Sequence, residues 1–277
     1  MAATAEVSKD AHKRIFDIVK GPNRLLMPIA GYEDLPLVTL EEAVIPLVDQ
    51  LPRIQTYVHV AKSRCDPLSA SELSVDQSAS IMLYTMESEP QNQCLYVVLN
   101  ATLRTEDRGK LKPWFSYLKL FLTALSNLPS SSRQVYRGVK KDLSSEYIKG
   151  EQFIWWAFSS CTLSVETLKN EQFLGKTGVR TLFSIECTSG KDISRHSYYA
   201  AEEELLLPPA RQFQVVASLQ LATDLHMIQL KEIDSPFINL PSISQTTSCG
   251  KNYSIEIFRF RTKRRTLFQY RYLLPVK

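Results

Sequence analysis

Three glutamates stand in a row inside the segment AAEEELLLPP, which runs from Ala200 to Pro209. The leucines before the proline pair predict a short buried strand, because proline cannot continue a hydrogen-bonded ladder. Side chains alternate along a strand, so Glu202 and Glu204 are expected on one face. Two neighbouring carboxylates separate each other's pKa values, so one can stay ionised beside a developing cation while the other exchanges a proton. The alternative is a solvated acidic turn before a core strand.

A second candidate is the segment VYRG, in which Arg137 lies within a strand pattern and Gly138 follows it directly. Arginine offers a planar fork of donors that suits phosphate oxygens, and glycine allows a close approach of backbone to a ligand. The alternative is an ordinary arginine at the edge of a strand. These two residues are therefore candidate contacts for a phosphate-bearing ligand.

A third candidate is the aromatic run WWAFSSCT, which ends in small hydroxyl residues. In an extended strand Ser160 and Thr162 project the same way, and the aromatic residues before them would anchor the sheet. Ordinary strand alternation explains the same pattern without a site. The two hydroxyls are candidates only in combination with the arginine and the glutamates.

Several familiar sites are absent from the sequence. It contains neither GxGxxG nor GxxxxGK[ST], so it offers no Rossmann fingerprint and no P-loop. The four histidines lack HExxH or another ligand spacing, and we expect no metal. One of them, His196 in SRHSYY, is polar and isolated, and we expect a structural role for it.

Charge is distributed unevenly along the 277 residues, which carry a formal net charge of +4. From Lys251 onward the chain has eight Lys or Arg and one Glu, so the preceding residues are slightly acidic. This basic tail could contact nucleic acid or a membrane surface, but we favour a solvated extension. Its alternation in SIEIFRFR also permits one added strand.

The remaining composition points to an intracellular, cytoplasmic protein. The polar N-terminus shows no secretory signal, and no apolar run is long enough to span a membrane. The five cysteines are an odd number without CxxC spacing, which favours a reducing compartment over a disulfide framework or a zinc site. The glycosylation sequons at Asn100 and Asn252 are then accidental.

The elements that must position these residues change type near Pro129. Capping-box pairs at Thr39 with Glu42 and at Ser74 with Gln77 predict helix starts, and prolines at 46 and 52 should divide the first of these helical regions. Apolar periodicity predicts further helices over Ser8–Lys20, Gln91–Arg104 and Lys112–Leu128.

After Pro129 the apolar period approaches two, which indicates strands. They are expected over Gln134–Val139, Phe153–Cys161, Arg180–Cys187, Glu203–Leu207, Phe213–Leu219 and His226–Ile233. Helices followed by strands, instead of an alternation of the two, predict an α+β fold.

In this order the three candidates resemble the arginine, serine, Glu-x-Glu signature of the arginine-specific mono-ADP-ribosyltransferase family, in its cholera-toxin-like class. The resemblance extends from about Phe16 to about Ile233. It is carried by the segments LEEAV, SASIMLYTMESEP, CLYVVLNATLR, KPWFSYLKLFLTAL, VYRGV, FLGKTGVRTLFSIE and EEELLLPP.

The resemblance implies how a co-substrate, NAD, would be held. Arg137 corresponds to the family arginine that holds the pyrophosphate, and Gly138 to the glycine whose backbone meets the nicotinamide amide. Phe173 corresponds to an aromatic residue that packs on nicotinamide. A bidentate arginine suits the pyrophosphate.

The resemblance also assigns the hydroxyls of the third candidate. Ser160 would order the site and Thr162 would close the Ser-x-Ser/Thr motif. The residue between them is Cys161, where threonine is common in the family, so a thiol is expected close to the site but facing away from Ser160.

The glutamates take the catalytic roles in this comparison. Glu204 corresponds to the invariant catalytic position, where a carboxylate stabilises the oxocarbenium-like ribose that forms as nicotinamide leaves. Glu202 corresponds to the first glutamate of the pair, which orients an arginine acceptor and accepts its proton. Glu203 is the structural residue between them.

The implied architecture is a helical N-terminal layer over residues 1–130 and a β-rich core over 131–234, with two packed sheets around an NAD cleft. Residues 235–277 form a linker and a basic tail of unknown structure. The implied activity is that of an NAD+–protein-arginine ADP-ribosyltransferase, with NADP as a second co-substrate and exposed arginines of proteins as acceptors. NAD glycohydrolysis and a non-catalytic NAD-binding interaction protein are the alternatives.

Overall fold

The fold was analysed in a computed structural model of the chain. It describes residues 26–27, 29–65, 73–169, 174–200 and 203–234, together with the backbone of 254–261 and 266–273. The helix expected over Ser8–Lys20 lies outside the described residues.

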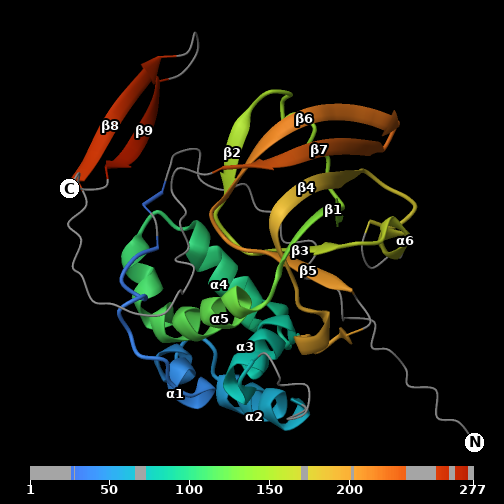
Figure 1. The fold of residues 1–277 in the computed structure, drawn as a ribbon. Coiled ribbons are helices and arrows are strands. Elements are labelled where there is room, and N and C mark those ends of the chain that lie inside the picture. Colours follow the sequence, from blue (N-terminus) through green and yellow to red (C-terminus); the bar gives the residue numbers. More distant parts are fainter. Residues whose placement is uncertain are drawn as a thin grey trace, which may run out of the picture.

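In the described chain the helices up to Asn127 precede the strands, and two short helices lie among the strands, which confirms the α+β class (Figure 1). Their bounds are α1 Leu40–Val44, η2 Ile45–Leu47, α2 Ile54–Arg64, α3 Val75–Thr85, η3 Gln91–Gln93, α4 Leu95–Arg104, η4 Arg108–Trp114, α5 Phe115–Asn127, α6 Val165–Leu168 and η5 Ser194–His196, where η marks a 3₁₀-helix. The predicted division of the first helical region is confirmed, since Pro46 lies in η2 and Pro52 precedes α2. None of the described helices offers a bilayer-spanning segment.

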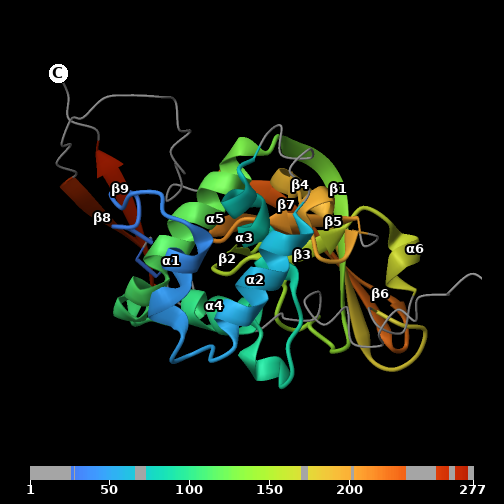
Figure 2. The same cartoon turned by 90° about the horizontal axis from the view of Figure 1, so that it is seen from below.

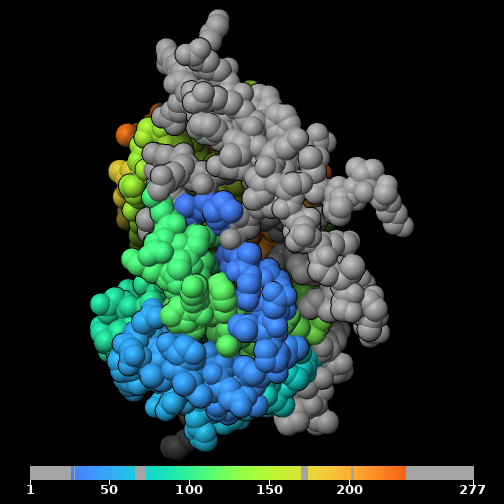
Figure 3. All heavy atoms as spheres, turned by 90° about the vertical axis from the view of Figure 1, so that its left-hand side faces the viewer, coloured from blue at the N-terminus to red at the C-terminus, as the bar shows by residue number. Residues whose placement is uncertain are grey.

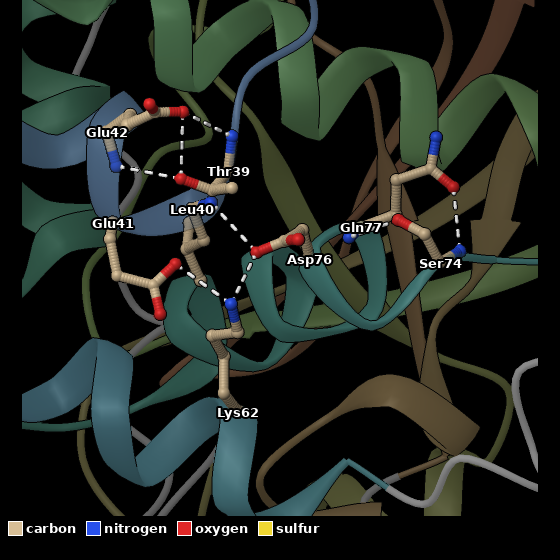
Figure 4. Close-up of polar contacts among 8 residues, drawn as sticks. All are labelled: Thr39, Leu40, Glu41, Glu42, Lys62, Ser74, Asp76 and Gln77. Carbon is tan, nitrogen blue, oxygen red and sulfur yellow. Dashed lines mark hydrogen bonds and ion pairs between the residues drawn. The ribbon is translucent and has the colours of Figure 1, made fainter.

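Both predicted capping boxes are present (Figure 4). The Thr39 hydroxyl accepts a hydrogen bond from the Glu42 amide, and the Glu42 carboxylate accepts one from the Thr39 amide. Ser74 and Gln77 make the same reciprocal pair at the start of α3. Each box satisfies backbone donors that the first helical turn leaves without a partner.

The three helices α1, α2 and α3 are joined by Asp76 (Figure 4). Its Oδ1 accepts hydrogen bonds from the Leu40 amide and from the Lys62 ammonium group, each at 2.9 Å. Lys62 also pairs with Glu41, and these two carboxylates raise its pKa. These contacts link α1, α2 and α3 to one another within the helical layer.

The described strands of the body pair into one continuous seven-stranded sheet in the order β1-β3-β5-β4-β7-β6-β2. Their bounds are β1 Ser130–Val139, β2 Gln152–Trp155, β3 Ser159–Thr162, β4 Arg180–Asp192, β5 Glu204–Leu207, β6 Arg211–Ala222 and β7 Leu225–Ile233. A further pairing joins β1 to β4, so β1, β3, β5 and β4 close into a ring. The two sheets expected from the sequence are thus connected through the long strand β4.

The sheet packs against the helices on one side and encloses a second core on the other. Figures 1 and 2 show α1 to α5 gathered together beside the strands, and Figure 3 shows the outer surface of this helical layer in blue and green. Phe158, Ile193 and Leu206 from the strand region belong to the helical core. Cys161 and Leu205, their neighbours along the strands, belong to the second core. The short strands β3 and β5 are therefore buried on both faces.

The single strand expected over Phe153–Cys161 is wrong. The chain forms β2, which pairs with β6, and then β3, which pairs with β1 and β5. Between them Phe158 turns into the helical core, and its amide donates to Asn100 Oδ1 of α4 at 3.2 Å. Asn100 is 3% exposed, so this sequon is structural.

The tail contains two strands where the sequence suggested at most one. β8 (Ser254–Arg261) pairs antiparallel with β9 (Thr266–Leu273), with Ser254 opposite Leu273. The side chains of this hairpin lie outside the part of the chain that is described.

Candidate active site

The three sequence candidates come to adjacent strands β1, β3 and β5. Across these strands Tyr136 lies opposite Thr162, and Thr162 lies opposite Glu204. Directly opposed residues share a face of the sheet, so these three side chains form one row. Ser160 lies on the same face as Thr162, two residues earlier along β3. The fold therefore places the serine, the threonine and the catalytic-position glutamate together.

Arg137 contacts the backbone of β3 from the other face of the sheet. Its Nη1 donates to the Ser160 carbonyl oxygen at 2.7 Å, and the side chain is 1% exposed. Arg137 lies opposite Phe183, and alternation puts it on the face of β1 that carries Val135 and Val139 toward the second core. The guanidinium thus reaches β3 from the face opposite to that of Glu204.

Ser160 has a buried hydroxyl without a hydrogen-bond partner among the described residues. The residue is 2% exposed. A buried polar atom without a partner is costly and is completed by a ligand or an ordered water. Ser160 lies opposite Leu206 of β5 and two residues before Thr162 of β3.

Gly138 is required by a close contact with Leu174. A Cβ at position 138 would lie 2.8 Å from the Leu174 Cβ and 3.2 Å from its Cα. Carbon atoms that are not bonded to each other do not come this close in folded proteins. Only glycine therefore fits at position 138 while Leu174 stays in place. Leu174 thus occupies the space beside the Gly138 Cα, and the contact of the Gly138 backbone with nicotinamide stays a prediction.

Glu204 is the first residue of β5, and it is 1% exposed. Its carbonyl oxygen accepts a hydrogen bond from the Ile193 amide at 3.1 Å. Glu203 before it is exposed and has a left-handed φ of +47°, so the strand does not extend back through this residue. The expected strand start at Glu203 is therefore wrong by one residue, and alternation does not locate the side chain of Glu202.

Two predicted site residues, Glu202 and Phe173, lie outside the described residues. Phe173 immediately precedes Leu174, whose side chain contacts Gly138. Glu202 lies two residues before Glu204 in the sequence. The part of the chain that is described holds no group of His, Cys, Asp or Glu suited to a metal ion.

Cys161 is an inert neighbour of the site. It lies in the second core, and burial raises the pKa of its thiol to about 12, with Arg137 opposing that rise. The thiol stays protonated at neutral pH, so it is not a nucleophile. As expected from alternation, it faces away from Ser160.

Tyr136 is a site residue that the sequence analysis missed. It is half-buried, heads the row through Thr162 to Glu204, and packs against the small cluster that includes Leu174. The sequence signal for Tyr136 was its position next to Arg137 in a strand. Neighbouring residues of a strand carry their side chains on opposite faces, so Tyr136 and Arg137 point to opposite faces of the sheet.

A separate hollow lies in the helical layer, away from β1, β3 and β5. It is lined by Tyr57, Leu83, Met86 and Glu87 among others, and it has an empty volume of about 390 Å³. The candidate site residues do not line it. No residue of β3 or β5, which carry Ser160 and Glu204, lines this hollow, so we assign it no part in the site.

Residues 50–236 match the family model described as NAD:arginine ADP-ribosyltransferase. The chain belongs to this family. The erythroblast NAD(P)(+)–arginine ADP-ribosyltransferase of Gallus gallus is 31% identical over 155 residues, which cover 54% of this chain and 49% of that protein. The protein Mav of Mycobacterium avium (strain 104) is 33% identical over 96 residues, which cover 34% of this chain and 11% of Mav. The chain thus spans half or less of these curated relatives.

Solved ADP-ribosyltransferase structures also align with this chain. The eukaryotic mono-ADP-ribosyltransferase ART2.2 is 20% identical, with a TM-score of 0.48 over 78% of this chain and 100% of that one. ADP-ribosyltransferase Vis, solved in complex with agmatine, is 18% identical, with a TM-score of 0.48 over 76% of this chain and 93% of Vis.

Proposed function

We propose that this chain transfers ADP-ribose from NAD to the guanidino group of a protein arginine and releases nicotinamide. Family membership supports the reaction class. The observation that carries the proposal is the row of Thr162 and Glu204 on paired strands, with Arg137 bonded to Ser160 beside it. These are the residue types that the reaction needs, gathered from parts of the chain that are distant in sequence.

Glu204 is the catalytic residue in this proposal. Breaking the bond between nicotinamide and ribose leaves an oxocarbenium-like sugar, and a carboxylate bonded to a ribose hydroxyl stabilises that charge. Its position at the start of β5, held by the strand ladder and by Ile193, fixes the carboxylate in advance. A group fixed in advance spends no reorganisation energy in the transition state.

Arg137 and Ser160 form the NAD-binding side of the site. The guanidinium offers several donors, of which Nη1 is bonded to the Ser160 carbonyl. A planar guanidinium suits the pyrophosphate oxygens, and we assign Arg137 to them. The buried Ser160 hydroxyl fits a polar ligand, because no described protein atom satisfies it. Gly138 and Phe173 are assigned to the nicotinamide side, and Leu174, which follows Phe173 in the sequence, contacts Gly138.

Glu202 sets the acceptor specificity. A charged guanidinium is a poor nucleophile, since its pKa is above about 12. A carboxylate in the loop before Glu204 orients the acceptor and accepts its proton as the new bond forms. Without an oriented acceptor, water would take the ADP-ribose and the chain would act as an NAD glycohydrolase.

The test measures nicotinamide release and ADP-ribose transfer from NAD to agmatine, a small guanidine. Wild type is compared with Glu202→Gln and Glu204→Gln, and Glu203→Gln is the matched control within the same run of glutamates. We expect Glu204→Gln to lose both activities by about a hundredfold or more. Glu202→Gln should lose transfer and keep hydrolysis, while Glu203→Gln should retain both.

The outcomes separate the alternatives. Nicotinamide release without transfer to agmatine would identify a glycohydrolase, and NAD binding without release would identify an interaction protein. Repeating the assay with NADP tests the second co-substrate. Equal activity of wild type and Glu204→Gln would overturn the proposal.

We propose the same catalytic unit that the sequence suggests, in which residues 1–130 and 131–234 act together. The shared core of helices and strands supports this assignment, because Phe158 and Leu206 pack among helical residues. We also propose that the protein works in a reducing, cytoplasmic compartment. The free thiols of the four described cysteines support this proposal. Proteins with exposed arginines are the proposed acceptors.

A further inference from the structure

The hollow in the helical layer lies where the start of α2 meets the end of α3. One wall comes from residues 51–54 and from Tyr57 of α2. The other wall comes from Leu83 and Met86 at the end of α3 and from the segment that follows this helix. The empty volume of about 390 Å³ includes space that is open to solvent, so a small ligand can enter from one side.

The floor of the hollow is apolar and buried. It consists of five side chains that are at most 6% exposed, namely Leu51, Ile54, Leu83, Met86 and Leu95. All five belong to the core of the helical layer, so close packing fixes their positions. An apolar group that lies on this floor is removed from water, which favours its binding.

Two carboxylates, those of Glu87 and Glu89, line one side of the hollow. The Tyr96 hydroxyl lies 3.2 Å from each carboxylate oxygen of Glu87 and donates to that group. The Cys94 thiol also donates to Glu87, with Sγ 3.5 Å from Oε2. Burial raises the pKa of this thiol, so it keeps the proton that it donates. These contacts hold the Glu87 carboxylate in place before a ligand arrives, which lowers the entropy cost of binding a cation.

The charge on the other side of the hollow comes from Arg53. Its guanidinium lies over the ring of Tyr57, 5.6 Å from the ring centroid. This ring face is therefore already covered by a cation, which repels a second one. The lining as a whole carries two carboxylates against this one guanidinium. A positively charged ligand is thus attracted to the side of Glu87 and Glu89 and kept away from Tyr57.

We propose that this hollow binds a small organic cation with an apolar body, the class of the arylalkylamines. The apolar body lies on the buried floor, and the ammonium group faces Glu87 and Glu89. Small-molecule sites share this arrangement, in which the walls are mostly apolar and a few polar groups orient the ligand. The candidate site residues do not line the hollow, and the inference does not rest on the proposed function.

The probe is phenethylamine, and the controls are phenethyl alcohol and phenylpropionate, which share its phenylethyl body but are neutral and anionic. Binding to the full chain is followed by NMR of methyl-labelled methionines, and Met86→Leu assigns the signal of Met86. The Met86 methyl group reports on the hollow, whereas Met82 lies on the same helix, is also buried and does not line it. Phenethylamine should shift the Met86 signal and bind about fivefold more tightly than the alcohol, with the anion weakest, because charge pairs near a surface add a modest factor.

The carboxylates are tested by Glu87→Gln and Glu89→Gln. Glu41→Gln is the matched control, because Glu41 belongs to the same helical layer but pairs with Lys62 outside the hollow. Each of the first two variants should weaken phenethylamine binding about two- to fivefold and leave phenethyl alcohol unchanged, while the control should leave both unchanged. Glu89 is exposed, so Glu89→Gln still decides the question where Glu87→Gln disturbs the packing around Tyr96.

The opposite charge is tested by Arg53→Gln. Loss of its repulsion should strengthen phenethylamine binding and weaken phenylpropionate binding, each by about twofold. Equal affinities for phenethylamine and phenethyl alcohol, or the absence of a Met86 shift, would overturn the inference. Wild-type affinity in both Glu87→Gln and Glu89→Gln would overturn it as well. The readout is binding alone, so a chain that neither releases nicotinamide nor labels agmatine would refute the proposed function and leave this test unaffected.

Discussion

Arg137 Nη1 donates to the carbonyl oxygen of Ser160 at 2.7 Å, and this bond ties the arginine that we propose for NAD binding to the strand that pairs with Glu204. Both residues are almost fully buried. A side chain that bonds a neighbouring strand and also offers donors to a ligand must keep a fixed geometry. The arginine fork supplies that geometry, and a lysine ammonium group does not.

Arg137→Lys should therefore weaken NAD binding and lower nicotinamide release by about a hundredfold or more, because a directed donor is lost. Calorimetry with NAD and a nicotinamide assay measure the two effects. Arg180→Lys is the matched control, since Arg180 is also buried but bonds Gly178 and Asp224 away from the site. Equal losses in both variants would show that the effect comes from burial alone.

Gly138→Ala should destabilise the fold or displace Leu174. The added methyl group would lie 2.8 Å from the Leu174 Cβ, and overpacking of this kind costs about 1–3 kcal/mol. Denaturant unfolding measures the cost. Gly109→Ala is the control, because the added methyl group would meet only the end of the Asp107 side chain, at 3.0 Å. Wild-type stability and activity in Gly138→Ala would mean that Leu174 moves freely.

Asn100→Ala should cost about 1–3 kcal/mol of unfolding free energy, because it leaves the buried Phe158 amide without its acceptor. The same change removes the donor to the Tyr84 hydroxyl. The exposed Asn127 at the end of α5 provides a control, and Asn127→Ala should change stability little. Chemical denaturation of both variants makes the comparison. A small loss in Asn100→Ala would indicate that water replaces the amide.

Cys161 should resist alkylation in the native protein at pH 8, because burial raises its thiol pKa to about 12. Among the four described cysteines, the half-buried Cys65 should react first. Mass spectrometry before and after unfolding measures both sites.

The raised thiol pKa also predicts how stability depends on pH. The contribution of Cys161 is complete below the ordinary thiol pKa of 9.0 and is lost as pH rises toward about 12, because the unfolded chain releases the proton first. Wild type should lose more stability between pH 8 and 11 than Cys161→Ala does. Parallel losses in the two proteins would contradict this account.

Helix starts were predictable because their signals are local. Thr39 with Glu42, and Ser74 with Gln77, satisfy each other's backbone groups within a single turn, whatever the rest of the chain does. The change from helices to strands near Pro129 follows from apolar period in the same way.

Strand bounds were less predictable because tertiary contacts set them. An apolar run from Phe153 to Cys161 permits one strand, but Asn100 and the helical core turn the chain at Phe158 and send the two halves to different partners. The start of β5 likewise depends on the left-handed backbone of Glu203, which alternation alone does not reveal.

The sequence by itself determined the α+β class, the residue types of the site and their order, because composition, capping and apolar period are local properties. Only the tertiary structure decided which of these residues meet. Thr162 faces Glu204 through strand register, and His196 meets Ser78 across 118 residues. Such pairs form where packing of the whole chain offsets the entropy of closing a long loop, and no local pattern records that balance.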